Sequence, residues 1–392
     1  MAINKDQILD QVMKDISTCM KGEVVGKYED LASKMDVNTL TTGSIGVDSI
    51  LGGGFPKGRL SLIVGMSSTG KTTLALTAIA ELQKKNPDAK VLYIDSECAL
   101  DPYYATSLGV DINKVYFAQP STGEKGYEIV ERFLVSGAMD LVVVDSIAAM
   151  LPQVLIDQEY AKDSPIGALA RLNARAIPRI NRMASQFGTT VIFINQYKKA
   201  VRINPYDTGD SINGTMFQPG GSTQLFYMSQ ILEIKKAGRI TENNEVVGNI
   251  TKVFVRKNKI SAPYRTAEFI ITFGKGLNKT AELITLCRTH GLIKAGGAWL
   301  RYNNATGAEV AKQGILALSS YLDSPEGAVD REFLYTQLRT KLIDAAAHFD
   351  FKNINSIHDD GNNEDIDDAT TDTNAAPEAH TENPEDDIAN YA

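Results

Sequence analysis

The sequence predicts an α/β fold with a mainly parallel central sheet, and three observations support this. Four short apolar runs recur along the 392-residue chain, at 60–64, 91–94, 141–144 and 191–194. Stretches of helical periodicity lie among them, at about 71–85, 124–136 and 166–187. A glycine-rich segment joins the first apolar run to the first helix. Near-continuous apolar strands that alternate with helices are typical of a parallel sheet covered on both faces.

The N-terminal residues 1–35 are expected to form a small helical element. The stretch MAINKDQILDQVMKDI is charged and has helical periodicity, and it lacks the apolar region of a signal peptide. The chain contains no run of 18 or more apolar residues, so no membrane span and a cytoplasmic location are expected. Its widely spaced cysteines fit a reducing compartment and predict neither a disulfide framework nor a zinc site: Cys19, Cys98 and Cys287.

The segment 65–73, GMSSTGKTT, contains the complete pattern G-x-x-x-x-G-K-[ST] between a predicted strand and a predicted helix. The backbone N–H groups of such a loop converge on phosphate oxygens at a helix N-terminus. Lys71 is expected to reach the β- and γ-phosphates, and the Thr72 hydroxyl to ligate Mg²⁺. A glycine turn that merely carries a lysine is the alternative, which the flanking elements disfavour. The expected phosphate-binding residues are Gly65, Ser67, Ser68, Thr69, Gly70, Lys71, Thr72 and Thr73.

Three polar side chains follow other strands at the same predicted edge of the sheet. Asp145 ends the run LVVV and is expected to hold Mg²⁺ through water. Glu97 follows the strand at 91–94 and is a candidate base for water, or else a cap of the next helix. Gln196 ends the run FIN, where its amide could bond a terminal phosphate or only cap the strand. The four histidines all lie beyond residue 289, which excludes histidine catalysis in this core.

The pattern changes after residue 196. Residues 197–223 form a long polar loop, which is usually functional or disordered. From about 229 to 273 strand follows strand, which predicts antiparallel strands that extend the same sheet. Pro178 lies inside the preceding helix and is expected to kink or split it. Basic residues around one sheet edge predict contact with a nucleic-acid backbone, a solvated face being the alternative: Lys198, Lys199, Arg202, Lys235, Lys236, Lys252, Arg256, Lys257 and Lys259.

The C-terminal part divides into a predicted α/β domain at 276–350 and a tail at 351–392. Residues 353–392 hold 12 acidic and no basic side chains, so they account for the net charge of −8 of the whole chain. This segment lacks the apolar residues needed for a core and is expected to be disordered. It is either a solubilising tail or a mimic of nucleic acid that competes for a basic groove on the same protein.

Several segments in this order resemble the bacterial RecA recombinase family: GMSSTGKTTL, LYIDSECALDPYYATSLGVD, DLVVVDSIAAMLP, TVIFINQ, KNKISAPYRTAEF and KAGGAWLRY. The resemblance covers about residues 35–302 and implies a P-loop ATPase core over 36–275. It implies DNA-binding loops at 157–166 and 197–219, and an N-terminal element that serves oligomerisation. The implied activity is a DNA-dependent ATPase that forms helical filaments on single-stranded DNA and catalyses homologous pairing and strand exchange in recombination and repair.

The resemblance also implies roles for individual residues. Lys71, Thr72 and Asp145 match positions that bind ATP phosphates and Mg²⁺, Glu97 matches the carboxylate that activates water, and Gln196 matches the γ-phosphate sensor. Asp101 and Tyr104 match the residues that contact the adenine. Lys257 and Lys259 match lysines that reach the ATP of the neighbouring subunit. The implied DNA-binding residues are Ile166, Arg171, Arg175, Lys198, Lys199, Arg202, Gly220, Gly221, Lys235, Lys236 and Lys252.

The sequence also departs from the family pattern. Cys98 stands in place of a histidine, Pro165 and Ile166 in place of a His-Met pair, and Leu225 in place of a lysine. Pro178 replaces a basic DNA-contacting residue, so Arg175 or Arg179 is expected to substitute for it. Aromatic residues of the second loop are candidates for stacking on bases: Tyr197, Tyr206 and Phe217.

These departures suggest a divergent member, encoded by a phage or plasmid, that would act at the nucleoid in its host's cytoplasm. Expected partners are single-stranded DNA, homologous duplex, further copies of the chain, and single-strand-binding and loader proteins. Two rival functions remain at this stage. One is a ring-shaped helicase built on the same core, and the other is a filament scaffold that coats DNA without strand exchange.

Overall fold

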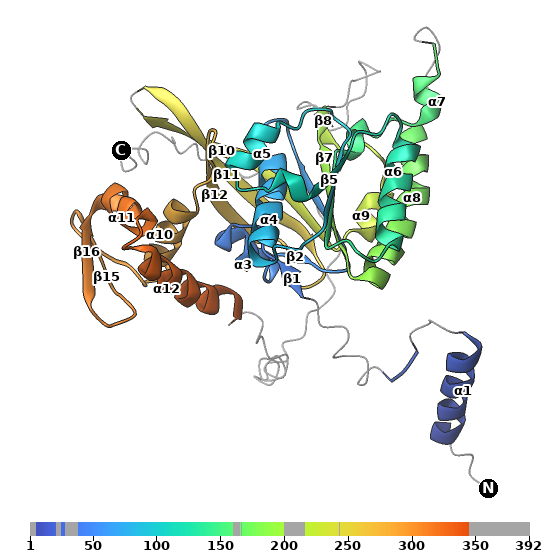
Figure 1. The fold of residues 1–392 in the computed structure, drawn as a ribbon, viewed down its shortest axis with the longest axis horizontal. Helices are drawn as coiled ribbons and strands as arrows, with labels where there is room; N and C mark the ends of the chain where they lie inside the picture. The colour runs from blue at the N-terminus through green and yellow to red at the C-terminus, as the bar shows by residue number, and fades with distance from the viewer. Residues whose placement is uncertain are drawn as a thin grey trace, which may run out of the picture.

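The computed structural model confirms the predicted α/β fold (Figure 1). It describes residues 5–20, 25–27, 38–159, 165, 167–199, 216–242 and 244–344. A nine-stranded sheet runs through the centre of this described part, in the order β13-β12-β11-β10-β3-β7-β6-β4-β5. Within the same ranges, every helix is too short or too polar to cross a lipid bilayer.

The parallel half of the sheet consists of the strands that the apolar runs predicted, together with one short edge strand. These are β3 (Leu60–Gly65), β4 (Val91–Asp95), β5 (Val115–Ala118), β6 (Leu141–Asp145) and β7 (Thr190–Gln196). All residues of β3, β4 and β6 are buried, as expected for strands covered on both faces. Because these strands run in one direction, their carboxyl ends meet at a single edge of the sheet.

The later strands extend the same sheet, as predicted, but not all of them are antiparallel to their neighbours. They are β10 (Gln230–Glu242), β11 (Glu245–Asn258), β12 (Thr266–Thr272) and β13 (Gly276–Leu277). β11, β12 and β13 follow as antiparallel neighbours, whereas β10 joins β3 in parallel. The parallel pairing arises because the connection from β7 returns the chain to the amino end of the sheet before β10 begins.

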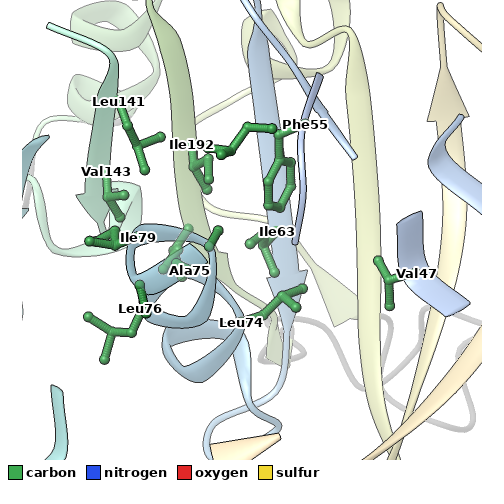
Figure 2. Packing of buried hydrophobic residues seen from close by; sticks show 14 of the residues in the cluster. Val47, Phe55, Ile63, Leu74, Ala75, Leu76, Ile79, Leu141, Val143 and Ile192 are labelled. Atoms are coloured by element: carbon green, nitrogen blue, oxygen red, sulfur yellow. The ribbon is translucent and has the colours of Figure 1, made fainter. Parts of the chain in front are cut away.

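Two apolar clusters cover the two faces of the sheet. On one face lie α3 (Ile45–Leu51), α4 (Lys71–Lys85) and α5 (Pro102–Ser107). On the other lie α6 (Gly123–Val135), α8 (Ala168–Phe187) and α9 (Thr223–Tyr227). Figure 2 shows the first face, where Leu74, Ala75 and Ile79 of α4 pack toward strand side chains including Ile63 and Ile192. This packing fixes α4, and with it the loop that precedes α4, against β3.

The remaining elements of the N-terminal part and the core are short, apart from the first helix. They are α1 (Lys5–Cys19), the paired strands β1 (Thr39–Leu40) and β2 (Phe55–Pro56), η1 (Ile112–Lys114), η2 (Ile147–Ala149), α7 (Gln153–Ile156), and the paired strands β8 (Lys198–Lys199) and β9 (Met216–Phe217).

The helix α8 is continuous through Pro178, so of the two predicted effects the split is wrong, while the kink stays a prediction. Proline removes one backbone donor and so deprives the carbonyl of Ala174, four residues earlier, of its partner. Ala174 is exposed, so solvent can replace that partner, while Ile177 and Ile180 beside the proline are fully buried. Their packing holds the helix on the sheet across the missing hydrogen bond.

The C-terminal part has a separate apolar cluster and a small sheet, in agreement with the predicted α/β composition. Its elements are α10 (Lys279–Thr289), β14 (Lys294–Gly296), β15 (Trp299–Asn303), β16 (Glu309–Gln313), α11 (Gly314–Asp323), α12 (Ala328–Arg339) and the π-helical turn η3 (Thr340–Asp344). The sequence predicted the strand at β15 but not β16, whose buried and exposed residues alternate only weakly. The predicted acidic tail lies outside the described residues.

Two buried carboxyl groups lie where the core meets α10. Asp48 of α3 accepts hydrogen bonds from the Thr42 backbone N–H at 2.8 Å and from the Thr42 hydroxyl at 2.7 Å. Glu282 of α10 accepts from the Ser44 hydroxyl and, at 3.0 Å, from the Gly46 backbone N–H. Burial raises the pKa of Asp48 to about 6 and that of Glu282 to about 7, although the hydrogen bonds oppose the shift.

The contribution of these two groups to the free energy of unfolding is therefore expected to fall as pH rises from about 4 to about 7. Because their pKa values are raised by folding, the folded chain still holds protons at a pH where the unfolded chain has released them. The stabilisation is therefore fully present below the pKa of the unfolded state, and it is lost as pH rises through the pKa of the folded state. Glu282→Gln should flatten this dependence between pH 5 and 7, measured by urea midpoints, while Glu309→Gln on exposed β16 should not. Equal slopes in the Glu282→Gln variant and the unmodified protein would contradict the assignment.

Candidate nucleotide and DNA site

The glycine-rich loop lies between the end of β3 and the first residue of α4, as the sequence predicted. Ser68 and Gly70 have positive φ angles of 57° and 96°. A Cβ atom at Gly65 would overlap the Ile234 carbonyl, and one at Gly70 would overlap the Ile271 side chain. Glycine is therefore required at Gly65 because the loop packs against the backbone of β10, and at Gly70 because of its positive φ angle.

Lys71 is a buried cation at the start of α4. Its side chain curls back over the loop, and Nζ donates to the Met66 carbonyl at 2.7 Å. Burial lowers the pKa of Lys71, and the nearby Asp145 and Glu97 carboxylates oppose that shift. A buried ammonium group gains most from an anionic partner, and the convergent N–H groups of this loop would also favour a phosphate.

Thr72 and Asp145 meet at the ends of α4 and β6. The Thr72 hydroxyl donates to Asp145 Oδ2 at 2.7 Å, and the Tyr93 hydroxyl donates to the same oxygen at 2.9 Å. Burial raises the pKa of Asp145, and the neighbouring Glu97 and Asp95 raise it further. The hydroxyl and carboxylate are hard oxygen ligands of the kind that Mg²⁺ prefers. Tyr93 was not anticipated from the sequence, because a tyrosine within an apolar strand carries no signal of this contact.

Glu97 and Gln196 contact each other across the carboxyl edge of the sheet. The Gln196 side-chain amide donates to Glu97 Oε1, and the Ser146 hydroxyl donates to the same oxygen at 2.6 Å. Asp101, not Glu97, caps α5, because the Asp101 carboxylate accepts from the Tyr103 backbone N–H at 2.9 Å. The structure therefore leaves Glu97 exposed at the mouth of the site.

Tyr104 lies beside the phosphate loop, on the α4 side of the sheet. Its hydroxyl is 2.9 Å from the Thr73 hydroxyl, and its ring packs against the first apolar cluster. Tyr103, its neighbour in α5, is 87% exposed. Of the expected adenine-binding pair, Asp101 and Tyr104, it is thus Tyr104 that lies next to the phosphate loop.

Three buried amides hold the end of the second predicted DNA loop. Asn195 Nδ2 donates to the Pro219 carbonyl at 2.9 Å, Gln224 Nε2 donates to the same carbonyl at 2.7 Å, and Asn173 Nδ2 donates to the Gly220 carbonyl at 2.8 Å. Gly220 has a φ of 93°, and a Cβ there would overlap Asn173. Sequence reasoning missed these amides, although Asn195 directly precedes Gln196 and thereby links the sensor to the loop end.

Comparison with known proteins agrees with this geometry. The sequence model of the RecA N-terminal domain matches residues 7–278 of the chain. Proteins named "Protein RecA" from the Staphylococcus aureus strains JH9, Newman and N315 are each 40% identical to it over 344 residues. Those alignments cover 86% of this chain and 93% of each relative.

The chain belongs to the RecA family. It is accordingly a DNA-dependent ATPase and recombinase, with the general activity of RecA proteins: filament formation on DNA and strand exchange. It is also an ATP-binding protein, as members of this family are. The match begins at residue 7, so it extends further toward the N-terminus than the sequence motifs from about residue 35 had indicated.

The structure describes only some of the predicted DNA-binding residues of this RecA chain. Arg171 and Arg175 are exposed on one face of α8, one turn apart, and Arg179 continues that face but forms an ion pair with Glu131 at 2.7 Å. Lys235 and Lys236 are exposed on β10, where Lys235 lies opposite Lys252 of β11. Lys198 lies on β8, which pairs with β9, while Ile166, Arg202 and the Lys199 side chain fall outside the described residues.

Lys257 and Lys259 lie away from the phosphate loop of their own chain. Lys257 Nζ donates to the carbonyls of Leu225, at 2.5 Å, and Phe226, at 3.0 Å, at the end of α9. Lys259 lines a cavity of about 660 Å³ together with Arg59, which precedes β3. Because the phosphate loop follows the opposite end of β3, these lysines face away from it, as a role toward a neighbouring subunit requires.

Tyr197 contacts its own sheet in this structure, and its stacking on DNA bases stays a prediction. Its side chain is half-buried against the α8 face of the sheet, and its hydroxyl donates to Glu233 at 2.6 Å. The other two candidates for stacking on bases, Tyr206 and the Phe217 side chain, lie outside the described residues. Tyr197 therefore anchors the beginning of the second loop to the sheet.

Proposed function

We propose that ATP hydrolysis in this chain takes place at the carboxyl edge of β3, β4, β6 and β7. The observation that supports this proposal is the convergence of the Lys71 ammonium, the Thr72–Asp145 pair and the Glu97–Gln196 pair at that edge. Residues from four separate strand ends provide in one place a phosphate cradle, oxygen ligands, a base and a sensor. This is the set of groups that phosphoryl transfer from ATP requires.

Thr72 and Asp145 would hold Mg²⁺, with Asp145 acting through water. Their oxygen atoms fit this ion, and burial of Asp145 beside two further carboxylates makes a cation favourable there. When bound, Mg²⁺ would neutralise charge on the phosphate oxygens. Lys71 binds the β- and γ-phosphates, while Asp101 and Tyr104 contact the adenine.

Glu97 acts as the base that takes a proton from the attacking water. The Ser146 hydroxyl and the Gln196 amide both donate to Glu97 Oε1, so they orient the carboxylate and leave Oε2 for water. The Gln196 amide has two N–H groups, so one can donate to the γ-phosphate while the other stays on Glu97. The sensor and the base are thus coupled, because a Gln196 amide that binds both groups links the γ-phosphate to the carboxylate of Glu97. Any backbone movement that accompanies this contact would displace the first residues of the second loop.

DNA binding is assigned to the second loop and to the basic residues around it. Asn195 and Asn173 tie Pro219 and Gly220 at the loop end to β7 and α8, so movement at the end of β7 would reach the loop at both ends. Positive charge on α8 and on the β10–β11 pair binds phosphate without reading sequence. The proposed DNA contacts are Ile166, Arg171, Arg175, Lys198, Lys199, Arg202, Gly220, Gly221, Lys235, Lys236 and Lys252.

The proposed organisation is an oligomerisation element at 1–35, a core at 36–275, a C-terminal domain at 276–350 and an acidic tail at 351–392. The core carries the nucleotide and DNA sites, and the first element joins neighbouring subunits. The chain would act in the cytoplasm at the nucleoid, together with single-strand-binding and loader proteins. A phage or plasmid origin is part of this proposal and rests on the departures at Cys98, Pro165 and Leu225.

Replacing Lys257 and Lys259 together by alanine should reduce cooperativity of assembly more than nucleotide affinity. Both lysines face away from the phosphate loop of their own chain, so they contribute to a neighbour's site. Hill coefficients for ATP and filament length by electron microscopy would measure the effect. Replacing Lys84 and Lys85, which are exposed at the end of α4, is the matched control. Monomers that hydrolyse ATP as fast as filaments would contradict a shared site.

The formation of joint molecules tests the function directly. The protein is incubated with a single-stranded oligonucleotide and ATP, supercoiled duplex is added, and D-loops are counted. Joints with homologous but not heterologous duplex are the expected result. Stimulation of ATPase by single-stranded DNA without joints would favour the filament scaffold or the helicase, and an unwinding assay would separate these two.

A further inference from the structure

Tyr197 reaches across the strand that leads into the phosphate loop. It directly follows Gln196 at the end of β7, and its backbone N–H donates to the Gly65 carbonyl at 3.2 Å. Its hydroxyl donates to Glu233 Oε1 on β10. Because β3 lies between β7 and β10, and neighbouring strands are about 4.8 Å apart, the tyrosine side chain spans the end of β3 to reach its acceptor.

A bulge in β11 adds a third member to this contact. Ile231 of β10 lies opposite Lys257, and the next residue, Leu232, lies opposite Val255, so Arg256 is an extra residue on β11. Bulges of this kind re-aim a side chain. The Arg256 guanidinium lies 3.5 Å from Glu233 Oε1, the same oxygen that accepts from Tyr197.

Tyr197, Glu233 and Arg256 form what we term the β3-spanning network. The Glu233 side chain is only 15% exposed, so these two partners provide contacts that water can supply only in part. Burial raises the pKa of the Tyr197 hydroxyl, and Glu233 raises it further, so the hydroxyl keeps its proton and remains a donor. Hydrogen bonds to an ionised group are stronger than those between neutral groups, and loss of one partner leaves the carboxylate poorly satisfied.

The two ends of this network lie next to residues that the proposed function assigns to two different nucleotides. Tyr197 is the neighbour in sequence of Gln196, which donates to Glu97 in the chain's own site. Arg256 immediately precedes Lys257, which faces away from that site and is assigned to the neighbouring subunit. A displacement of the backbone at Gln196 and Tyr197 would therefore either break the Tyr197–Glu233 bond or draw β10 and β11 along with it.

We propose that the β3-spanning network positions Gln196 relative to the Lys257 segment, and so couples ATP binding in one site to DNA binding and to the next site along the filament. This inference rests on the proposed function, because the network is proposed to position Gln196, the residue to which that function assigns contact with the γ-phosphate. Tyr197 is a positioning residue: it acts through Gln196 and Lys257.

Tyr197→Phe tests the coupling, because it removes one hydroxyl and keeps the ring. We expect unchanged ATP affinity in the absence of DNA. The affinity for single-stranded DNA is measured with a slowly hydrolysed ATP analogue and with ADP, and the ratio of the two affinities is compared between variants. This ratio should fall by about 10-fold, the effect expected from the loss of one hydrogen bond to a charged group. Fluorescence anisotropy with a labelled oligonucleotide measures both affinities. Tyr116→Phe, at an exposed tyrosine of the edge strand β5, is the matched control.

A second variant shows whether the network acts as a unit. Glu233→Gln should lower the same ratio, and the double variant with Tyr197→Phe should lose little more than the larger single loss. An unchanged ratio, or equal losses of DNA affinity with both nucleotides, would overturn the coupling. The network would then only support the structure of the loop. If the unmodified protein gains no DNA affinity with the ATP analogue, the proposed function itself fails, and the coupling falls with it.

Discussion

The Lys71→Ala variant is expected to lose ATP-dependent DNA binding altogether. Lys71 is the buried cation of the phosphate loop, and its ammonium is held over the loop by a hydrogen bond to the Met66 carbonyl. Removal of charge-assisted hydrogen bonds to two phosphates should weaken ATP binding by about 10- to 100-fold or more. Because DNA affinity in this proposal depends on γ-phosphate contact at Gln196, the loss at the nucleotide site should appear in full at the DNA site.

Titration with a fluorescent ATP analogue, followed by anisotropy of a labelled oligonucleotide, would measure both losses. Lys85→Ala is the matched control, because Lys85 lies exposed at the other end of the same helix α4. Circular dichroism would establish that both variants are folded. Retention of ATP-dependent DNA binding by Lys71→Ala would show that the loop is not the site that drives assembly.

The Glu97→Ala variant should separate ATP binding from ATP hydrolysis. The carboxylate is exposed at the mouth of the site and is oriented by Ser146 and Gln196, but it forms no part of the phosphate cradle. ATP binding and filament formation should therefore persist. Turnover should fall by about 10² or more, the size of a general-base contribution.

Release of inorganic phosphate in a single turnover, with saturating ATP and single-stranded DNA, isolates this step. Glu97→Gln keeps the shape of the side chain and should fail in the same way, which separates loss of the base from loss of packing. Glu128→Gln, at an exposed carboxylate on α6 that pairs with Arg132, should hydrolyse ATP normally. Normal hydrolysis by Glu97→Ala would show that another group activates the water.

Local patterns were sufficient for the glycine-rich loop and for the buried parallel strands β3, β4, β6 and β7. The motif from Gly65 to Thr72 depends on glycine conformations and on a strand followed by a helix, and these are properties of adjacent residues. The buried strands were visible because a parallel sheet covered on both faces demands continuous apolar runs. The effect of Pro178 was not predictable locally, because the burial of Ile177 and Ile180 against the sheet outweighs one missing hydrogen bond.

Side-chain contacts between strands could not be predicted in the same way. Tyr93 beside Asp145, Ser146 beside Glu97, and the amides of Asn173 and Asn195 are brought together by the order and register of the strands. An isolated tyrosine or asparagine in the sequence has many satisfactory environments, so its residue type carries no information about which one it occupies.

By itself, the sequence determined the fold class, the family and the place of the glycine-rich loop between β3 and α4, because each depends on spacing along the chain. Only the tertiary structure decided that Gln196 donates to Glu97, that Lys257 faces away from its own phosphate loop, and that Tyr197 spans β3 to Glu233. These contacts join segments that are remote in sequence, and their geometry is set by sheet register and by a single bulge at Arg256.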